Sequence, residues 1–323
     1  MKKALITGIN GQDGSYLSEF LLEKDYEVHG ILKRNSIAEN QTARIQHIYP
    51  EIKNNLYHAD VTDMASLLSV INKVRPDEIY NLAAQSHVRV SFDQPIYTMD
   101  SVGRGVLNLL EVIRLTNSKA KIYQASSSEM FGNSIDSDGF QRETTPMNPV
   151  SPYACSKLLA YSFIRCYRES YGMFASNGIL FNHESPRRGA NFVTNKVAIG
   201  AVRIKKGLQK QLVLGNLDST RDWGHAKDYV KIMWQILQLD EPNDFVCATG
   251  VSHSVRELCE YAFGRLELDY RDYVVQDSKF FRPTELRDLK GCTKKLESAI
   301  DLNFEYTFGI MIDEMIDYWM ERL

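Results

Sequence analysis

Paired cysteines, long apolar runs and an excess of charge of one sign are all missing from this sequence. The five cysteines are scattered and show no Cys-x-x-Cys spacing, so neither a disulfide framework nor a metal site is predicted. No apolar run approaches the roughly 20 residues of a membrane helix, and the first one is too short for a signal peptide. A net charge of −3 offers no basic field for nucleic acid or an anionic membrane. We therefore expect a cytoplasmic protein whose ligand is small.

The 323 residues, 44% of them hydrophobic, are enough for one large or two medium globular domains. In the first half, short apolar runs alternate with amphipathic stretches; they are Lys3–Thr7, Tyr16–Glu23, Glu27–Leu32, Glu78–Leu82 and Lys121–Ala125. Strand–helix alternation at this spacing predicts an α/β fold with a doubly wound, Rossmann-like parallel sheet.

The second half is more irregular. Loops rich in Arg, Asn and Pro are expected at 181–194, 216–223 and 280–286. Two strand-like runs, at 178–181 and 244–248, are expected to return to the sheet. We therefore assign residues 1–178 to the cofactor-binding domain, with later returns at about 215–250, and 179–323 mainly to a smaller α/β lobe that holds the substrate.

A glycine-rich segment follows the first predicted strand and opens a helix, where backbone amides can hold a pyrophosphate. Its Gly-x-x-Gly-x-x-Gly spacing resembles that of the extended short-chain dehydrogenase/reductases. The cofactor residues expected here are Gly8, Asn10, Gly11, Gln12, Asp13 and Gly14. The alternative is a glycine-rich turn without a ligand.

The end of the second strand indicates NADP. An acidic residue there would accept a hydrogen bond from the ribose 2′-hydroxyl of NAD, but this chain has Lys33 and Arg34 followed by Asn35 and Ser36. The alternative is a solvated basic loop. Later strand ends should pass the adenine and the middle of the cofactor; they carry Asp60, Val61, Leu82, Ala83, Ala84, Gln85 and Ser86.

Tyr153 and Lys157 have the Tyr-x-x-x-Lys spacing that puts both side chains on one face of a helix. A lysine ammonium, together with oxidised nicotinamide, would lower the pKa of the phenol so that it accepts an alcohol proton. Alone the pattern is weak, because such pairs are common on solvated helices. The serine-rich run upstream strengthens it, and Ser127 is expected to orient the substrate hydroxyl.

Glu129 indicates which chemistry follows the oxidation. An epimerase or a simple dehydrogenase needs only the Tyr, Lys and Ser set, whereas elimination of water also needs a base for the proton beside the new ketone. Glu129 could take the C5 proton and return a proton to the departing C6 hydroxyl. The alternative is a glutamate that caps a helix or faces solvent.

Taken together, the chain closely resembles GDP-mannose 4,6-dehydratases from Lys3 to its C-terminal helix. The resemblance is carried by residues 7–14, 81–86, 123–126, 180–189, 221–229 and 281–285. It implies a catalytic trio of Ser127, Glu129 and Tyr153, with Lys157 in support. It also implies NADP contacts at Tyr97, His183 and Arg188, and a GDP-sugar site that includes Ser86, Asn182, Lys196, Arg221, Arg282 and Glu285. Similarity to the family further implies a homodimer or homotetramer, in which the loop from Arg34 to Arg44 reaches a neighbouring subunit's cofactor.

The chain departs from the family at Ser127, where threonine is usual. The missing methyl leaves more room near the sugar, and some relatives act on GDP-manno-heptoses, whose C6 carries an extra hydroxymethyl group. The resemblance thus predicts dehydration of GDP-mannose or, alternatively, of GDP-D-glycero-manno-heptose. A nucleotide-sugar epimerase, a 4-dehydrogenase and a non-catalytic NADP sensor are the remaining readings.

Overall fold

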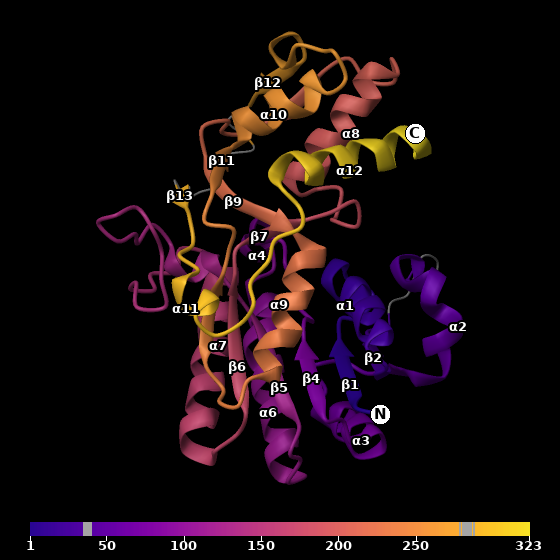
Figure 1. Cartoon of the computed structure of the whole chain (residues 1–323), viewed down its shortest axis with the longest axis vertical. Helices are drawn as coiled ribbons and strands as arrows, with labels where there is room; N and C mark the ends of the chain where they lie inside the picture. The colour runs from indigo at the N-terminus through magenta and orange to yellow at the C-terminus, as the bar shows by residue number, and fades with distance from the viewer. Residues whose placement is uncertain (35–40, 278, 280–285, 287) are drawn as a thin grey trace.

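The computed structural model describes residues 1–34, 41–277, 279, 286 and 288–323, and contains a parallel sheet with a smaller lobe beside it (Figure 1). The strands of the main sheet are β1 (Lys3–Thr7), β2 (Glu27–Leu32), β3 (Leu56–His58), β4 (Glu78–Asn81), β5 (Lys121–Ser127), β6 (Ala175–Leu180) and β10 (Asp244–Cys247). Their order is β10-β6-β5-β4-β1-β2-β3, and every pairing is parallel. The doubly wound parallel sheet predicted from the sequence is confirmed.

This order places a topological switch between β1 and β4, because the chain winds outward from β1 to β3 and then returns to the other side. In such sheets ligands bind outside the carboxyl ends of the strands at the switch. β6 and β10 extend the sheet beyond β5, so the two late runs expected to return to it do so.

Helices cover both faces of the sheet. α1 (Gln12–Glu23) and α9 (Ala226–Gln238) pack on one face, and α3 (Met64–Val74), α6 (Gly105–Leu115) and α7 (Pro152–Tyr171) on the other. Successive strand residues serve opposite cores: Ile6 lies in the α1/α9 core and Leu5 in the α3/α6/α7 core. Burial on both faces explains the continuous apolar character of the strands.

Short elements lie between these units. They are η1 (Ala43–Ile48), α2 (Tyr49–Ile52), η2 (Lys53–Asn55), α4 (Val88–Asp93), α5 (Pro95–Met99), the π-helical turn η3 (Asp100–Arg104), η4 (Ser128–Phe131) and α11 (Lys294–Glu297). None of the helices in the described part of the chain has both the length and the apolar character needed to cross a bilayer.

The smaller lobe has its own core, which includes Trp223, Phe263 and Ile312. Its strands are β7 (Asn182–Glu184), β8 (Leu212–Leu214), β9 (Thr220–His225), β11 (Ser252–Ser254), β12 (Val274–Gln276) and β13 (Asp288–Leu289). Its helices are α8 (Val193–Lys205), α10 (Val255–Gly264), η5 (Tyr270–Asp272) and α12 (Phe308–Arg322). Figure 1 shows this lobe above the carboxyl ends of the main strands.

One expectation about local structure was wrong. Residues 182–184 and 220–223 were expected to be loop, yet they lie in β7 and β9, which pair with each other in parallel. Strands this short, whose partner is about 40 residues away, leave no local periodicity for a sequence to show. The first helix begins at Gln12, within the glycine-rich segment that was predicted to open it.

Candidate active site

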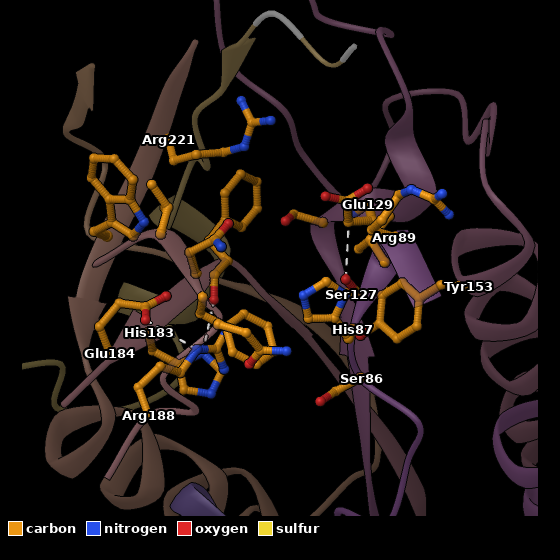
Figure 2. Close-up of a pocket in the computed structure, with 18 of the residues that line it drawn as sticks. Ser86, His87, Arg89, Ser127, Glu129, Tyr153, His183, Glu184, Arg188 and Arg221 are labelled. Carbon is orange, nitrogen blue, oxygen red and sulfur yellow. Dashed lines mark hydrogen bonds and ion pairs between the residues drawn. The ribbon is translucent and has the colours of Figure 1, made fainter. Parts of the chain in front are cut away.

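A cavity of about 960 Å³ lies at the carboxyl ends of β4, β5 and β6, between the main sheet and the smaller lobe (Figure 2). The residues predicted from the sequence that line it are Asp13, Leu82, Ala84, Ser86, Ser127, Glu129, Tyr153, Lys157, Asn182, His183, Arg188, Lys196 and Arg221. Segments from residue 13 to residue 221 thus meet at one place.

Other predicted residues lie outside this lining. They are Gly8, Asn10, Gly11, Gln12, Gly14, Arg34, Asp60, Val61, Ala83, Gln85 and Tyr97. The first five form the turn before α1 and its first residues, beside Asp13. Four further predicted residues, Asn35, Ser36, Arg282 and Glu285, lie outside the described residues.

Tyr153 and Lys157 are positioned by the first turns of α7. The Ser151 hydroxyl caps this helix by accepting a hydrogen bond from the Ala154 amide at 3.1 Å, and Pro152 occupies the first turn, where its missing N–H costs nothing. Lys157 Nζ donates to the Ala125 carbonyl at 2.6 Å and lies 5.7 Å from the centre of the Tyr153 ring. The helix is thereby fixed against the end of β5.

Both titratable groups respond to burial. Burial raises the pKa of Tyr153 to about 12, with Ser127 opposing and Glu129 adding to the shift. Burial also lowers the pKa of Lys157 to about 8, against the field of Asp13. Among the protein's own groups, burial outweighs the lowering by Ser127 and Arg188, so they leave the pKa of the phenol raised. The expected lowering also depends on the oxidised nicotinamide and stays a prediction.

Ser127 and Glu129 lie where β5 passes into η4. The Ser127 hydroxyl accepts a hydrogen bond from the Glu129 amide at 3.3 Å, which caps the short 3₁₀ turn and carries the Glu129 side chain into the cavity. Gly132 ends the turn with φ of 59°, where a Cβ would lie 1.9 Å from the Asn148 carbonyl oxygen. Figure 2 shows Ser127, Glu129 and Tyr153 together on one wall.

The glycine-rich turn has the geometry of a nucleotide cradle. Gly8 has φ of +71°, and a Cβ on Gly14 would lie 2.3 Å from the Gly8 carbonyl oxygen, so these positions require glycine. The Gly11 N-cap provides no side-chain capping bond to α1. The amides of the first turn can therefore face an anion, and the turn fits a dinucleotide pyrophosphate.

Beside this turn, Lys33 forms an ion pair with Asp60 at 3.0 Å and donates to the Tyr97 hydroxyl at 3.0 Å. Asp60 also accepts from the Thr62 amide and hydroxyl, each at 2.9 Å. The Asp60 carboxylate is thus paired with the Lys33 ammonium, while Arg34, just after β2, remains exposed. Among the residues that the structure describes between β2 and β3, there is no excess of negative charge that would repel a phosphate.

The wall opposite Tyr153 is built from β7 and the segment after it (Figure 2). His183 Nε2 lies 2.8 Å from the Asp13 carboxylate, and its ring stacks on Tyr229 at 4.6 Å. Arg188 pairs with Glu184 at 3.0 Å and lies 3.8 Å above the Phe192 ring. These contacts hold a histidine and an arginine at the cavity with fixed orientations.

Two further cations line the side toward the smaller lobe. Lys196, on α8, donates to the Val213 carbonyl at 2.7 Å, and burial lowers its pKa. Arg221, on β9, is only 7% exposed and donates to the Thr220 and Leu286 carbonyls at 2.6 and 3.1 Å. Both are suited to binding a diphosphate or a nucleobase carbonyl.

Sequence reasoning did not name several residues that line the cavity, among them His87, Arg89, Glu184 and Phe192. His87 caps α4 through Nδ1, and its ring lies 5.3 Å from that of Phe192. His87 and Arg89 directly follow the segment 81–86, and Glu184 and Phe192 lie within or next to 180–189. Extending each predicted segment by a few residues would have found them.

The part of the Arg34–Arg44 loop that the structure describes contacts its own chain. Arg44 donates to the Arg187 carbonyl at 2.9 Å, and the Asn10 side chain donates to the Gln41 carbonyl at 3.0 Å. The loop end thus lies over the glycine-rich turn of the same subunit.

The sequence and the fold both have close counterparts. A family model described as GDP-mannose 4,6 dehydratase matches residues 5–315. GDP-mannose 4,6 dehydratase 1 of Arabidopsis thaliana is 49% identical, with 98% of this chain and 90% of that protein covered, and GDP-mannose 4,6 dehydratase of Homo sapiens is 48% identical, with 97% and 90% covered. Among solved structures, a UDP-glucose 4-epimerase of Thermus thermophilus in complex with NAD is 25% identical with a TM-score of 0.84, covering 98% of each chain. DesIV, a dTDP-glucose 4,6-dehydratase of Streptomyces venezuelae, is 22% identical with a TM-score of 0.86, covering 99% and 97%. The chain is therefore an enzyme of the GDP-mannose 4,6-dehydratase family, within the extended short-chain dehydrogenase/reductase fold.

Proposed function

We propose that this enzyme catalyses the NADP-dependent 4,6-dehydration of GDP-mannose to GDP-4-keto-6-deoxymannose. The observation that carries the proposal is the convergence of Ser127, Glu129, Tyr153 and Lys157 on one cavity. A carboxylate beside the tyrosine and serine supplies the additional base that water elimination needs. The relatives named above carry the same activity in their names.

The cofactor site we propose runs from the glycine-rich turn toward Tyr153. Amides of the α1 N-terminus hold the pyrophosphate, and Ser86, His183 and Arg188 flank the path to the catalytic wall. When bound, the nicotinamide supplies the redox step, taking two electrons from the sugar at C4 and returning them at C6. Because no carboxylate other than the Lys33-paired Asp60 is seen beside the end of β2 in the described residues, the 2′-phosphate of NADP is accommodated there.

The protein's own groups move the protons. The Tyr153 phenolate accepts the proton of the C4 hydroxyl, and the Ser127 hydroxyl orients that oxygen. Glu129 then removes the C5 proton, which the new ketone has acidified, and donates it to the C6 hydroxyl as water leaves. One water is lost per turnover. The electrons removed at C4 return at C6 while a proton from solvent is added at C5, and Tyr153 releases to solvent the proton it took, so no external oxidant or net proton is consumed.

The GDP part of the substrate is assigned to the smaller lobe. Asn182, Lys196 and Arg221 line the cavity on that side, and charge-assisted bonds from lysine and arginine suit a diphosphate. This supports assigning 179–323 mainly to the substrate, beside 1–178 with returns at about 215–250 for the cofactor, except that Arg221 lies within 215–250 and yet belongs to β9 of the smaller lobe. We further propose a cytoplasmic homodimer or homotetramer; a reducing compartment suits the five free cysteines.

Ser127 favours a second candidate substrate, GDP-D-glycero-manno-heptose, because the position lacks the methyl of the usual threonine. The two substrates are distinguished by incubating the purified enzyme with each and following the loss of one water by mass spectrometry. Deuterium uptake at C5 in heavy water supports the elimination.

Other outcomes of the same assay would contradict the proposal. Steady accumulation of NADPH without loss of water indicates a 4-dehydrogenase, and an isomeric sugar of unchanged mass indicates an epimerase. Binding of NADP with no chemical change to either sugar indicates a non-catalytic sensor.

A further inference from the structure

His183 presents both of its ring nitrogens to hydrogen-bond acceptors. Nδ1 lies 2.8 Å from the Phe181 carbonyl oxygen, and Nε2 lies 2.8 Å from Oδ2 of Asp13. A carbonyl and a carboxylate can only accept, so each nitrogen needs a proton of its own. Turning the ring over would put carbon atoms against both acceptors and lose both hydrogen bonds.

The pair is shielded from water. His183 is 7% exposed, and its ring stacks on Tyr229 of α9 with ring centres 4.6 Å apart. Asp13 uses its second oxygen to accept from the Gln12 side chain at 3.0 Å, and Gln12 also donates to the His183 carbonyl at 3.1 Å. Both oxygens of the carboxylate are therefore engaged by the protein, and the pair has a fixed geometry.

The position of Asp13 gives the pair its importance. Asp13 lies in the first turn of α1, where the helix dipole and free amides favour an anion, and it lines the cavity. An uncompensated carboxylate there would repel a dinucleotide pyrophosphate. A cationic partner removes that repulsion.

We infer that Asp13 is a positioning residue that holds His183 as a buried imidazolium cation, so that the anion-binding turn of the cofactor site carries a neutral pair instead of a lone carboxylate. The inference rests on the proposed cofactor site and adds a charge state and a role to it. The sequence alone assigned Asp13 only to contact with the cofactor.

The charged groups around the pair are consistent with this state. Burial lowers the pKa of His183, but Asp13 outweighs burial and the pKa is raised; the Arg188 charge opposes the rise. Burial raises and His183 lowers the pKa of Asp13, with a net lowering. Asp13 also acts on the catalytic wall, because its charge raises the pKa of both Lys157 and Tyr153.

The protonation state is tested directly by ¹⁵N NMR of the histidine-labelled protein without cofactor, with the His183 signals identified from their loss in His183→Gln. We expect both ring nitrogens of His183 to be protonated at pH 7, above the ordinary imidazole pKa of about 6.5. In Asp13→Asn we expect the ring to be mainly neutral at pH 7. Glu23→Gln removes the same charge from the exposed end of α1 and should leave the signals unchanged.

NADP affinity provides the second test. His183→Gln leaves Asp13 uncompensated and should weaken NADP binding at least about tenfold, the size of a lost charged contact. The double variant Asp13→Asn/His183→Gln lacks the unpaired carboxylate and should recover much of the lost NADP affinity. A purely structural role of the two residues would not produce this recovery. A neutral His183 in the wild type at pH 7, or a double variant that binds no better than His183→Gln, overturns the inference. Because the NMR measurement needs neither cofactor nor sugar, its result is separate from failure of the proposed reaction.

Discussion

The Lys157 ammonium donates a hydrogen bond to the Ala125 carbonyl oxygen at 2.6 Å and lies 5.7 Å from the centre of the Tyr153 ring. The lysine therefore joins the catalytic helix α7 to the end of β5, the strand that carries Ser127. Oxidation at C4 uses Tyr153 of α7, whereas the later elimination uses Glu129, just after β5. Both steps can act on one bound sugar only if α7 and β5 keep this relative position.

Tyr153→Phe should strongly reduce turnover while leaving the fold intact, because the phenyl ring keeps its packing and only the proton acceptor is lost. We expect kcat to fall about 10²–10⁴-fold. Burial raises the pKa of Tyr153 to about 12, so its phenolate fraction, and with it wild-type activity, should rise with pH between 6 and 8. Steady-state rates across this range provide the measurement, and a Tyr153→Phe variant that keeps the same pH-dependent rise would contradict the role.

Glu129→Gln should separate the two halves of the reaction. The amide cannot take the C5 proton, so loss of water should fall by about 10²-fold or more, whereas oxidation at C4 should survive. The variant should accumulate reduced cofactor in single-turnover absorbance measurements, and mass spectrometry should show no dehydrated sugar. A silent substitution would instead favour an epimerase.

Gly14→Ala should remove cofactor binding. The added Cβ would lie 2.3 Å from the Gly8 carbonyl oxygen and 2.7 Å from Cα of Ile9, so the turn must open. We expect a loss of roughly 1–3 kcal/mol in the free energy of unfolding and little NADP binding by calorimetry. Gly264→Ala is the matched control, because its Cβ would meet nothing within 4 Å. If both substitutions reduced stability and NADP binding equally, the glycine-rich turn would not be the cofactor site.

The sequence predicted those parts of the site whose geometry is local. The four-residue spacing of Tyr153 and Lys157 fixes their common face, and the glycine spacing fixes the turn before α1. The pairing of His183 with Asp13 joins residues 170 positions apart, and β7 pairs with β9 across the smaller lobe. Such contacts depend on how the chain folds back on itself, and no periodicity records them. The effect of burial on Tyr153 was missed for the same reason.

Glu314→Gln should weaken the attachment of α12 in a pH-dependent way. Burial alone would raise the pKa of Glu314, but His225 and Lys227 lower it to about 2. Nε2 of His225 and Nζ of Lys227 lie 2.8 and 2.9 Å from the Glu314 carboxylate oxygens. The lowered pKa contributes stability that is fully present above the ordinary carboxyl value of 4.5 and is lost as pH falls toward 2. Because the side chain is 32% exposed, we expect a cost of only about 1–2 kcal/mol at pH 7.

Urea unfolding at pH 7 and pH 3.5 measures this dependence, and the difference between wild type and Glu314→Gln should be smaller at the lower pH. Glu321→Gln lies on the same helix with its side chain 77% exposed, and should change stability little at either pH. A Glu314 effect that grows on acidification would contradict the assignment.

Ser127→Thr should make the enzyme more selective for GDP-mannose over the heptose substrate. The threonine hydroxyl can still accept from the Glu129 amide, now 3.3 Å from the serine oxygen, and threonine is favourable at the end of a strand such as β5. Its methyl fills space in the cavity that the hydroxymethyl group of a manno-heptose would need. One methyl group in a pocket typically changes kcat/KM by about 10–200-fold. We therefore expect turnover of GDP-mannose to stay within about threefold, and the ratio of heptose to mannose kcat/KM to fall by at least about tenfold. An equal loss on both sugars would mean that the methyl disturbs Ser127 itself and that substrate size is set elsewhere in the cavity.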